Sequence, residues 1–258
     1  MHVAFTEKDH KYVDDAGVQY TSITTLLGEY KEKFNEIRAS ESCVLREDGK
    51  WYGMVPAEVR KIWQDERDRS TTLGTWYHKL REDELVEGIQ CPIVDGVKMS
   101  LPQELQNGIY PEFIVYYPEY QIAGQIDYLQ IDGNKFRIRD YKTSKEIRAT
   151  AFRDKKMKYP LNNVPDCSLY HYAMQLSLYA NMITFWNPKL QVDELIIEHV
   201  VFEVEKMDDN GYPIYKINSD GEFIIKSVTP IKVPYMLYEV RKLLKVHAYI
   251  LEQQRALK

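Results

Sequence analysis

The chain has 258 residues, a formal net charge of −5, 28% charged residues and 44% hydrophobic residues. This composition is ordinary for a globular protein, and no apolar run approaches the ~18 residues that span a bilayer. Without a signal-peptide pattern at the N-terminus, we expect a cytoplasmic protein that does not bind a membrane. The acidic balance counts mildly against a nucleic-acid binder, unless the acids gather around a bound cation.

The three cysteines are Cys43, Cys91 and Cys167, and they lie far apart in the sequence. An odd number of cysteines without a Cys-x-x-Cys spacing argues against a disulfide framework or a zinc ribbon. The same spacing argues against a cysteine-ligated iron–sulfur cluster, so we expect none.

The first part of the chain, 1–69, is predicted as a short hairpin followed by a mostly helical region. Strands are expected at 3–5, 12–13 and 18–20. Ser22 is the expected cap of a helix over 23–36, and further helices are expected near 38–47 and 57–69.

The second part, 70–258, is predicted to begin with a helix that Ser70, Thr71 or Thr72 caps and that ends near 86. Three consecutive strands follow at 111–117, 120–131 and 135–143, and then a polar, basic loop over 145–165. A long helix is expected from Asp166 or Ser168 to 186, where Asn187-Pro188 ends it. Strands at 194–205, 213–218 and 222–227 and a helix over 233–256 complete the order. This order predicts an α/β or α+β fold with one central mixed sheet flanked by helices, in one compact unit.

The most informative segment is the hairpin predicted over 122–143. Gly133-Asn134 is a two-residue turn signal, and counting back from it pairs Asp127 with Asp140. Side chains repeat every second residue along a strand, so Lys142 shares their face. Like charges directly opposite each other destabilise a sheet, which favours a divalent metal between them. The alternative is a solvated hairpin with a surface Asp–Lys pair.

Four further residues are candidates for the same site. His78 lies on a predicted helix one turn after Gly74, and a glycine there suggests the close approach of another backbone. Gln175 and Tyr179 are one turn apart and share a helix face. Glu112 would pair with Gln125 if Pro118-Glu119 forms the turn, which places it at the edge of the acidic face. Each also has an ordinary structural interpretation, as a surface histidine, helix-forming residues or a strand-edge acid.

These residues together resemble the PD-(D/E)xK nuclease superfamily, and its RecB-like branch in particular. The family pattern is a helix histidine, Gly-x-x-Asp, Asp-x-Lys and Gln-x-x-x-Tyr, in that order. Here these motifs stand as His78, Gly124–Asp127, Asp140–Lys142 and Gln175–Tyr179. The resemblance covers residues 70–185, and the segment 10–24 also looks like the start of phage and mitochondrial members. Many CRISPR adaptation nucleases hold an iron–sulfur cluster with four cysteines, whereas this chain has three cysteines that lie far apart.

The resemblance implies a restriction-endonuclease-like sheet and a metal-dependent exonuclease that acts on single-stranded DNA or DNA ends in replication, recombination or repair. Oxygen ligands with one imidazole suit Mg²⁺ or Mn²⁺. Asp127 and Asp140 would hold the metal with His78, and the Tyr141 carbonyl and Glu112 are further candidate ligands. Lys142 would orient or deprotonate the attacking water. Gln175 and Tyr179 would contact the phosphate or the adjacent nucleotide.

The segment 145–158 carries six cations against two acids, and it begins three residues after Lys142. We expect it to form a phosphate-binding lip in which Lys155, Lys156 and Lys158 contact DNA, unless it is only a solvated loop. Two other functions stay open on the same residues. One is a structure-specific or restriction-type endonuclease, and the other is a non-catalytic nucleic-acid-binding accessory protein.

Overall fold

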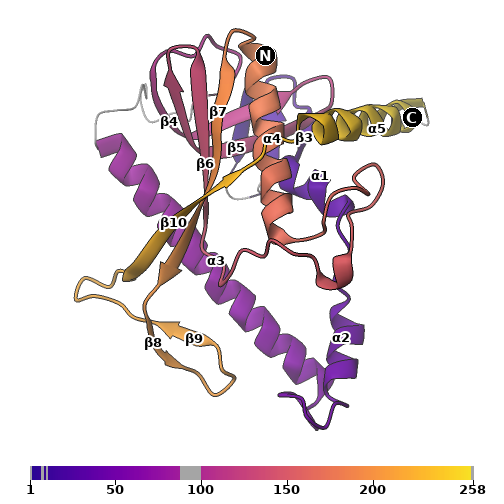
Figure 1. The fold of residues 1–258 in the computed structure, drawn as a ribbon, viewed down its shortest axis with the longest axis vertical. Helices are drawn as coiled ribbons and strands as arrows, with labels where there is room; N and C mark the ends of the chain where they lie inside the picture. Colours follow the sequence, from indigo (N-terminus) through magenta and orange to yellow (C-terminus); the bar gives the residue numbers. More distant parts are fainter. Residues whose placement is uncertain (1, 7–8, 10, 88–99, 257–258) are drawn as a thin grey trace.

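The computed structural model describes residues 2–6, 9, 11–87 and 100–256 (Figure 1). Within these residues, eight strands form one mixed sheet in the order β1-β2-β3-β5-β6-β7-β10, and β4 pairs with β5. β3 is parallel to β5 and β6 is parallel to β7, whereas the other neighbours are antiparallel. The strands are β1 (Val3–Thr6), β2 (Lys11–Asp14), β3 (Gln19–Ser22), β4 (Gly108–Tyr117), β5 (Ile122–Asp132), β6 (Lys135–Lys142), β7 (Gln191–Phe202) and β10 (Ile225–Val233). The predicted α/β class with a central mixed sheet is therefore confirmed.

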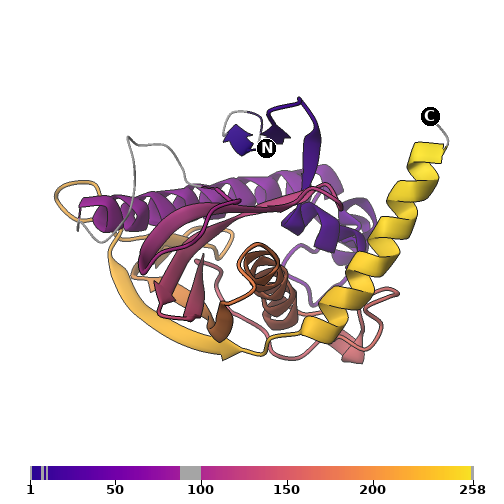
Figure 2. The same ribbon diagram turned by 90° about the horizontal axis from the view of Figure 1, so that it is seen from above.

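Five α-helices surround this sheet in the described part of the chain. They are α1 (Ile23–Glu29), α2 (Glu36–Cys43), α3 (Pro56–Glu87), α4 (Ser168–Trp186) and α5 (Leu237–Ala256). Figure 2 shows α3 crossing one side of the sheet, while the sheet curves around α4 on the other side. A separate two-stranded ribbon is formed by β8 (Val204–Met207) and β9 (Pro213–Tyr215). Among the described helices, none is both long and apolar enough to cross a membrane.

The three strands expected near the N-terminus are present, but they extend the central sheet, so the description of this region as mostly helical is wrong. Val3, Tyr12 and Tyr20 alternate with exposed residues and are buried in the main core. Ser22 then caps α1 as predicted, and its hydroxyl accepts a hydrogen bond from the Thr25 backbone N–H at 3.0 Å. The helix ends at Glu29, seven residues before the predicted end.

The two helices predicted over 57–86 form one continuous helix of 32 residues, α3. The proposed caps Ser70, Thr71 and Thr72 therefore lie inside it. The Thr72 hydroxyl donates a hydrogen bond to the Asp68 carbonyl at 2.9 Å, so it bonds back to its own helix. The division of the chain at residue 69 stays a prediction, and that residue lies within α3.

Two apolar clusters cover opposite sides of the sheet. The main core includes Leu129, Ile138 and Leu176, and it joins the sheet to α1, α4 and α5. The smaller cluster packs α3 against the other side through Leu73, Tyr77, Tyr128, Tyr141 and Phe202. Neighbouring residues of β5 and β6 thus alternate between α4 and α3, as the pleat requires. The candidate site lies where side chains from both helices reach the same hairpin.

The register of the β4–β5 hairpin differs from the prediction by two residues. Tyr117 pairs with Ile122 instead of Tyr120, because the turn spans 118–121. Pro111 pairs with Tyr128 and Phe113 pairs with Ile126, so Glu112 lies across from Asp127 rather than from Gln125.

Candidate metal centre and active site

The β5–β6 hairpin has the predicted register up to the point where the acids meet. Asp132 pairs with Lys135, and Leu129 pairs with Ile138. Gly133 adopts a φ of +60°, which the predicted tight turn needs. Toward the site, the paired residues of β5 and β6 continue as far as Tyr128 and Arg139. Beyond this pair, Oδ2 of Asp127 accepts a hydrogen bond from the Tyr141 backbone N–H at 2.7 Å, so a side chain takes the place of a strand carbonyl.

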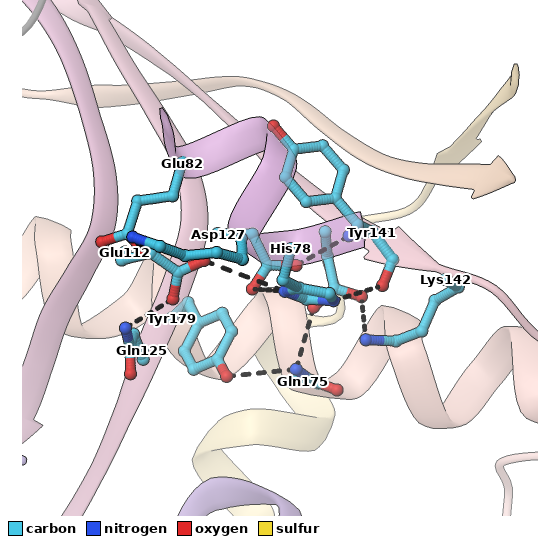
Figure 3. A network of polar contacts seen from close by, with 11 residues as sticks. His78, Glu82, Glu112, Gln125, Asp127, Tyr141, Lys142, Gln175 and Tyr179 are labelled. Carbon is cyan, nitrogen blue, oxygen red and sulfur yellow. Dashed lines mark hydrogen bonds and ion pairs between the residues drawn. The ribbon is translucent and has the colours of Figure 1, made fainter. Parts of the chain in front are cut away.

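His78 reaches this hairpin from α3 (Figure 3). Its Nδ1 lies 3.5 Å from Oδ1 of Asp127 and 3.8 Å from Oε1 of Glu112. Its Nε2 lies 3.3 Å from the Tyr141 carbonyl. A carbonyl only accepts hydrogen bonds, so this contact assigns a hydrogen to Nε2 and directs Nδ1 toward the two carboxylates. The Tyr141 carbonyl, expected as a metal ligand, is therefore a partner of His78.

The side chains of His78, Glu112 and Asp127 form a group whose ligand atoms all lie within 4.8 Å of one another. We call these three residues the metal group, because this set of donors could hold a metal ion. Asp127 is buried, whereas His78 and Glu112 are half-buried. Glu112, which the sequence placed at the edge, belongs to the group, and Asp140 does not.

Glu112 adopts a backbone conformation that is rare for a side-chain-bearing residue. Its φ is +49°, in the left-handed region, within an otherwise extended strand. Such a conformation costs about 1–3 kcal/mol and persists where the surroundings enforce it. The Gln125 side-chain amide donates a hydrogen bond to Oε2 of Glu112, which leaves Oε1 toward His78. Gln125 is thus a site residue that the sequence named only as a strand partner of Glu112.

Asp140 belongs to a second set of contacts beside the metal group. The Lys142 ammonium lies 2.6 Å from Oδ2 of Asp140, and the Gln175 amide donates to Oδ1 at 3.0 Å. We call Asp140, Lys142 and Gln175 the lysine group. The Gln175 amide also donates to the Tyr179 hydroxyl at 3.1 Å. Gln175 and Tyr179 are both buried. Gln175 contacts Asp140 directly, and Tyr179 contacts it through Gln175.

The glycine and the tyrosine of two separate motifs touch each other. A Cβ atom on Gly124 would lie 2.5 Å from Cε1 of Tyr179, a distance that real Cβ atoms essentially never show. The absence of a side chain at Gly124 therefore lets the Tyr179 ring pack against β5. Gly74 has a different setting, since a Cβ there would meet only the Thr143 hydroxyl at 3.4 Å. The close backbone approach that we inferred from Gly74 is wrong.

Burial and charge have opposite effects on the pKa of His78, Asp127, Asp140 and Lys142. Burial raises the pKa of Asp127 and of Asp140, and the cations His78 and Lys142 only partly offset it. Burial alone would lower the pKa of His78, but the Asp127 and Glu112 carboxylates raise it to about 9. The pKa of Lys142 is likewise raised, since the Asp140 and Asp127 carboxylates outweigh the effect of burial.

The balance of charge fits a divalent cation. A histidine that binds a metal is neutral, and with His78 in this form the carboxylates of Glu112, Asp127 and Asp140 stand against the Lys142 ammonium, which leaves two negative charges. Carboxylate oxygens with one imidazole nitrogen are ligands that Mn²⁺ accepts, and carboxylates also suit Mg²⁺. A metal-bound histidine commonly donates its second ring N–H to a carbonyl, as His78 does to Tyr141. The residues present therefore fit a metal ion.

Tyr12 is a neighbour of the metal group that the sequence did not indicate. Burial raises the pKa of its phenol, and the Glu112 and Asp127 carboxylates raise it further, which shows that they lie close. The sequence assigned Tyr12 to a strand and to the opening segment that resembles phage and mitochondrial nucleases, but not to the site. His10, which opens the segment that resembles phage and mitochondrial nucleases, lies outside the described residues, as does Cys91. Cys43 and Cys167 are free thiols.

The three lysines of the expected phosphate-binding lip have different settings. Lys155 forms an ion pair with Glu32, and the Lys158 ammonium donates to the Glu29 carbonyl at 3.2 Å. Lys156 is exposed, and its backbone bridges to Pro165. The lip thus lies against the C-terminal end of α1 and the segment after it, which Lys158 and Lys155 respectively contact.

Comparison of the chain with protein-family models and with curated proteins found no match. The interpretation of the site therefore depends on its residues and their geometry.

Proposed function

We propose that this protein is a metal-dependent nuclease that hydrolyses phosphodiester bonds as an exonuclease on single-stranded DNA or DNA ends. The observation that carries the proposal is the metal group beside the Asp140–Lys142 ion pair, where α3 and β4 meet the β5–β6 hairpin. The four motifs come from distant parts of the sequence, and residues from each of them contact one another at the candidate site. Their meeting supports membership of the PD-(D/E)xK superfamily and a restriction-endonuclease-like fold.

His78, Glu112 and Asp127 would hold Mg²⁺ or Mn²⁺, with Asp140 as the next candidate ligand on the neighbouring strand. Such a cation polarises a phosphoryl oxygen and lowers the pKa of its bound water. Oε1 of Glu112 and Nδ1 of His78 already face each other, so the two side chains need little reorganisation to bind the same metal ion.

Lys142 would supply a fixed positive charge beside the reacting phosphate. The raised pKa keeps its ammonium protonated at neutral pH, so it donates hydrogen bonds and does not act as a general base. It would orient the attacking water and stabilise negative charge that develops on the phosphate. Gln175 and Tyr179 would hold Asp140, and thereby Lys142, in position.

The test uses single-stranded and double-stranded DNA labelled at the 5′ or the 3′ end, with Mg²⁺, with Mn²⁺ and with EDTA. We expect metal-dependent release of short labelled products from free ends and no release by Lys142→Met. Covalently closed single-stranded circles should resist the enzyme, and cutting them would favour the endonuclease alternative. An absence of cleavage of every substrate with both metals would contradict the nuclease function.

A further inference from the structure

A groove of about 690 Å³ lies between the segment that joins α1 to α2 and the loop that follows β6. Phe34 and Arg38 line one wall, and Arg148 and Phe152 line the other. The two phenylalanines are 68% and 69% exposed. Large apolar side chains that are this exposed on both walls of one groove indicate a surface that meets a partner.

The charge of the groove differs in sign from that of the chain. Its lining contains four cations against Glu32 and Asp166, whereas the whole chain carries −5; the cations are Lys33, Arg38, Arg148 and Lys155. Three of the cations have a nearby carboxylate, on Glu29, Glu146 or Glu32. Arg38 has no ion pair in the part of the chain that the structure describes. Its guanidinium is therefore free to meet an anionic partner.

Aromatic rings continue from the groove across α3. The Phe34 ring centroid lies 5.8 Å from that of Trp63, and Trp63 lies 6.4 Å from Trp51. The Lys50 ammonium lies over both Trp51 and Tyr212, at 4.2 and 4.4 Å. The groove is thus one end of a row of rings, Phe34, Trp63, Trp51 and Tyr212, in which the Lys50 ammonium lies between the last two.

A series of contacts along α4 connects the groove with the candidate active site. Asp166 lines the groove, and its Oδ1 lies 2.6 Å from Nε2 of His171, one turn before Gln175 on α4. The next residue on that helix is Tyr172, and Lys142 lies 5.0 Å from its ring centroid. The start of α4 thus contacts the groove through His171 and the lysine group through Tyr172.

We infer that this groove binds a single-stranded nucleic acid, with unpaired bases stacked on Phe34 and Phe152 and phosphates beside Arg38 and Arg148. The inference rests on the proposed nuclease function and specifies its substrate as a strand with exposed bases. Exposed rings combined with cations suit bases and phosphates at once, because every base offers a stacking face whatever its identity. A duplex hides these faces, so it would gain only the contacts to phosphate.

The test measures fluorescence anisotropy of a labelled oligothymidylate of about 16 nucleotides, in EDTA so that nothing is cut. Each lost ring should weaken binding about tenfold, so Phe34→Ala/Phe152→Ala should bind about a hundredfold more weakly than wild type. Tyr238→Ala is the matched control, because Tyr238 is also 68% exposed but lies on α5 outside the groove. It should bind as wild type does.

A strand of the same length without bases separates stacking from charge. Wild type and the double variant should bind this abasic strand equally, and Arg38→Ala should weaken binding to both strands. Phe34→Tyr/Phe152→Tyr, which keeps both rings, should restore binding to the oligothymidylate. Unchanged affinity of the alanine double variant, or an equal loss on the abasic strand or on a duplex, would overturn the inference.

The nuclease assay keeps the two ideas apart. If wild type degrades DNA with metal but the double variant binds oligothymidylate normally, the groove assignment fails and the function stands. If the double variant loses binding but wild type cleaves nothing with either metal, the groove stands and the nuclease proposal fails.

Discussion

The metal group and the lysine group meet at the β5–β6 hairpin, yet the charges of their carboxylates are compensated in different ways. In the lysine group, Asp140 faces a permanent cation and an amide donor, so both of its oxygens have partners within the chain. In the metal group, Glu112 and Asp127 share only His78, whose charge depends on a proton. A buried carboxylate is stable only when a positive charge or hydrogen bonds compensate it.

This difference indicates separate tasks for the two groups. The metal group could hold a metal ion in place of a proton, whereas the Asp140 carboxylate already has Lys142 and Gln175 as partners. The sequence pattern alone treats Asp127 and Asp140 as equivalent, because they have the same parity on neighbouring strands. The structure distinguishes them through the side chains that approach from α3 and from α4.

The largest expected effect is on the rate of hydrolysis, which should fall strongly when one residue of either group is replaced. Asp127→Asn and Lys142→Met should each reduce DNA hydrolysis by roughly 10²–10³-fold, since each removes one element of transition-state stabilisation. Only Asp127→Asn should also weaken Mn²⁺ binding, measured by titration calorimetry. Asp132→Asn, at the turn of the same hairpin, serves as the control and should change neither property. Equal loss of Mn²⁺ affinity in both variants would remove the distinction between the two groups.

The next effect is on stability, and its sign should depend on metal. Burial raises the pKa of Asp127 in the folded state, so the stability of the metal-free protein falls as the pH rises through that pKa. Asp127→Asn removes this ionisation while its amide oxygen still accepts from Tyr141, so in EDTA at pH 8 the variant should be at least as stable as wild type. At 100 times the dissociation constant, Mn²⁺ should stabilise wild type by about 2.7 kcal/mol.

Thermal melts with EDTA and with Mn²⁺ measure this reversal. Glu119→Gln, in the exposed β4–β5 turn, is a control for the loss of one acid and should show no reversal. If Asp127→Asn is less stable than wild type under both conditions, Asp127 is an ordinary structural acid.

The sequence predicted those parts of the site that depend on local signals. The Gly133-Asn134 turn and the alternation of Leu129, Ile131, Phe136 and Ile138 determine the β5–β6 register, because a slip by one residue would expose the whole apolar face. The β4–β5 register was wrong because four residues form its turn and Pro118-Glu119 does not define such a length. Glu112 was therefore placed near the site through an incorrect pairing.

Other features depend on contacts between distant segments and have no local signal. The positive φ of Glu112 occurs at a glutamate that contacts His78 and Gln125, and no glycine or asparagine at this position predicts it. The separation of Asp140 from the metal group depends on Gln175, which is 35 residues away along the chain. Ser70, Thr71 and Thr72 look like caps, but packing of α3 on the sheet carries the helix through them.

The smallest expected effect concerns the support beneath the lysine group, and it comes from a single methyl group. Gly124→Ala would place Cβ 2.5 Å from a ring carbon of the buried Tyr179, so the ring and β5 must move apart. Overpacking of this kind costs about 1–3 kcal/mol. Because Tyr179 contacts Gln175 and Gln175 holds Asp140, the shift should lower hydrolysis while leaving Mn²⁺ affinity near that of wild type. Gly74→Ala is the matched control, since its methyl group meets only ordinary contact and gains up to ~1 kcal/mol of helix propensity. Urea unfolding of both variants measures the difference, which should have opposite signs. A Gly124→Ala protein as stable and as active as wild type would show that Tyr179 can leave β5 without disturbing Asp140.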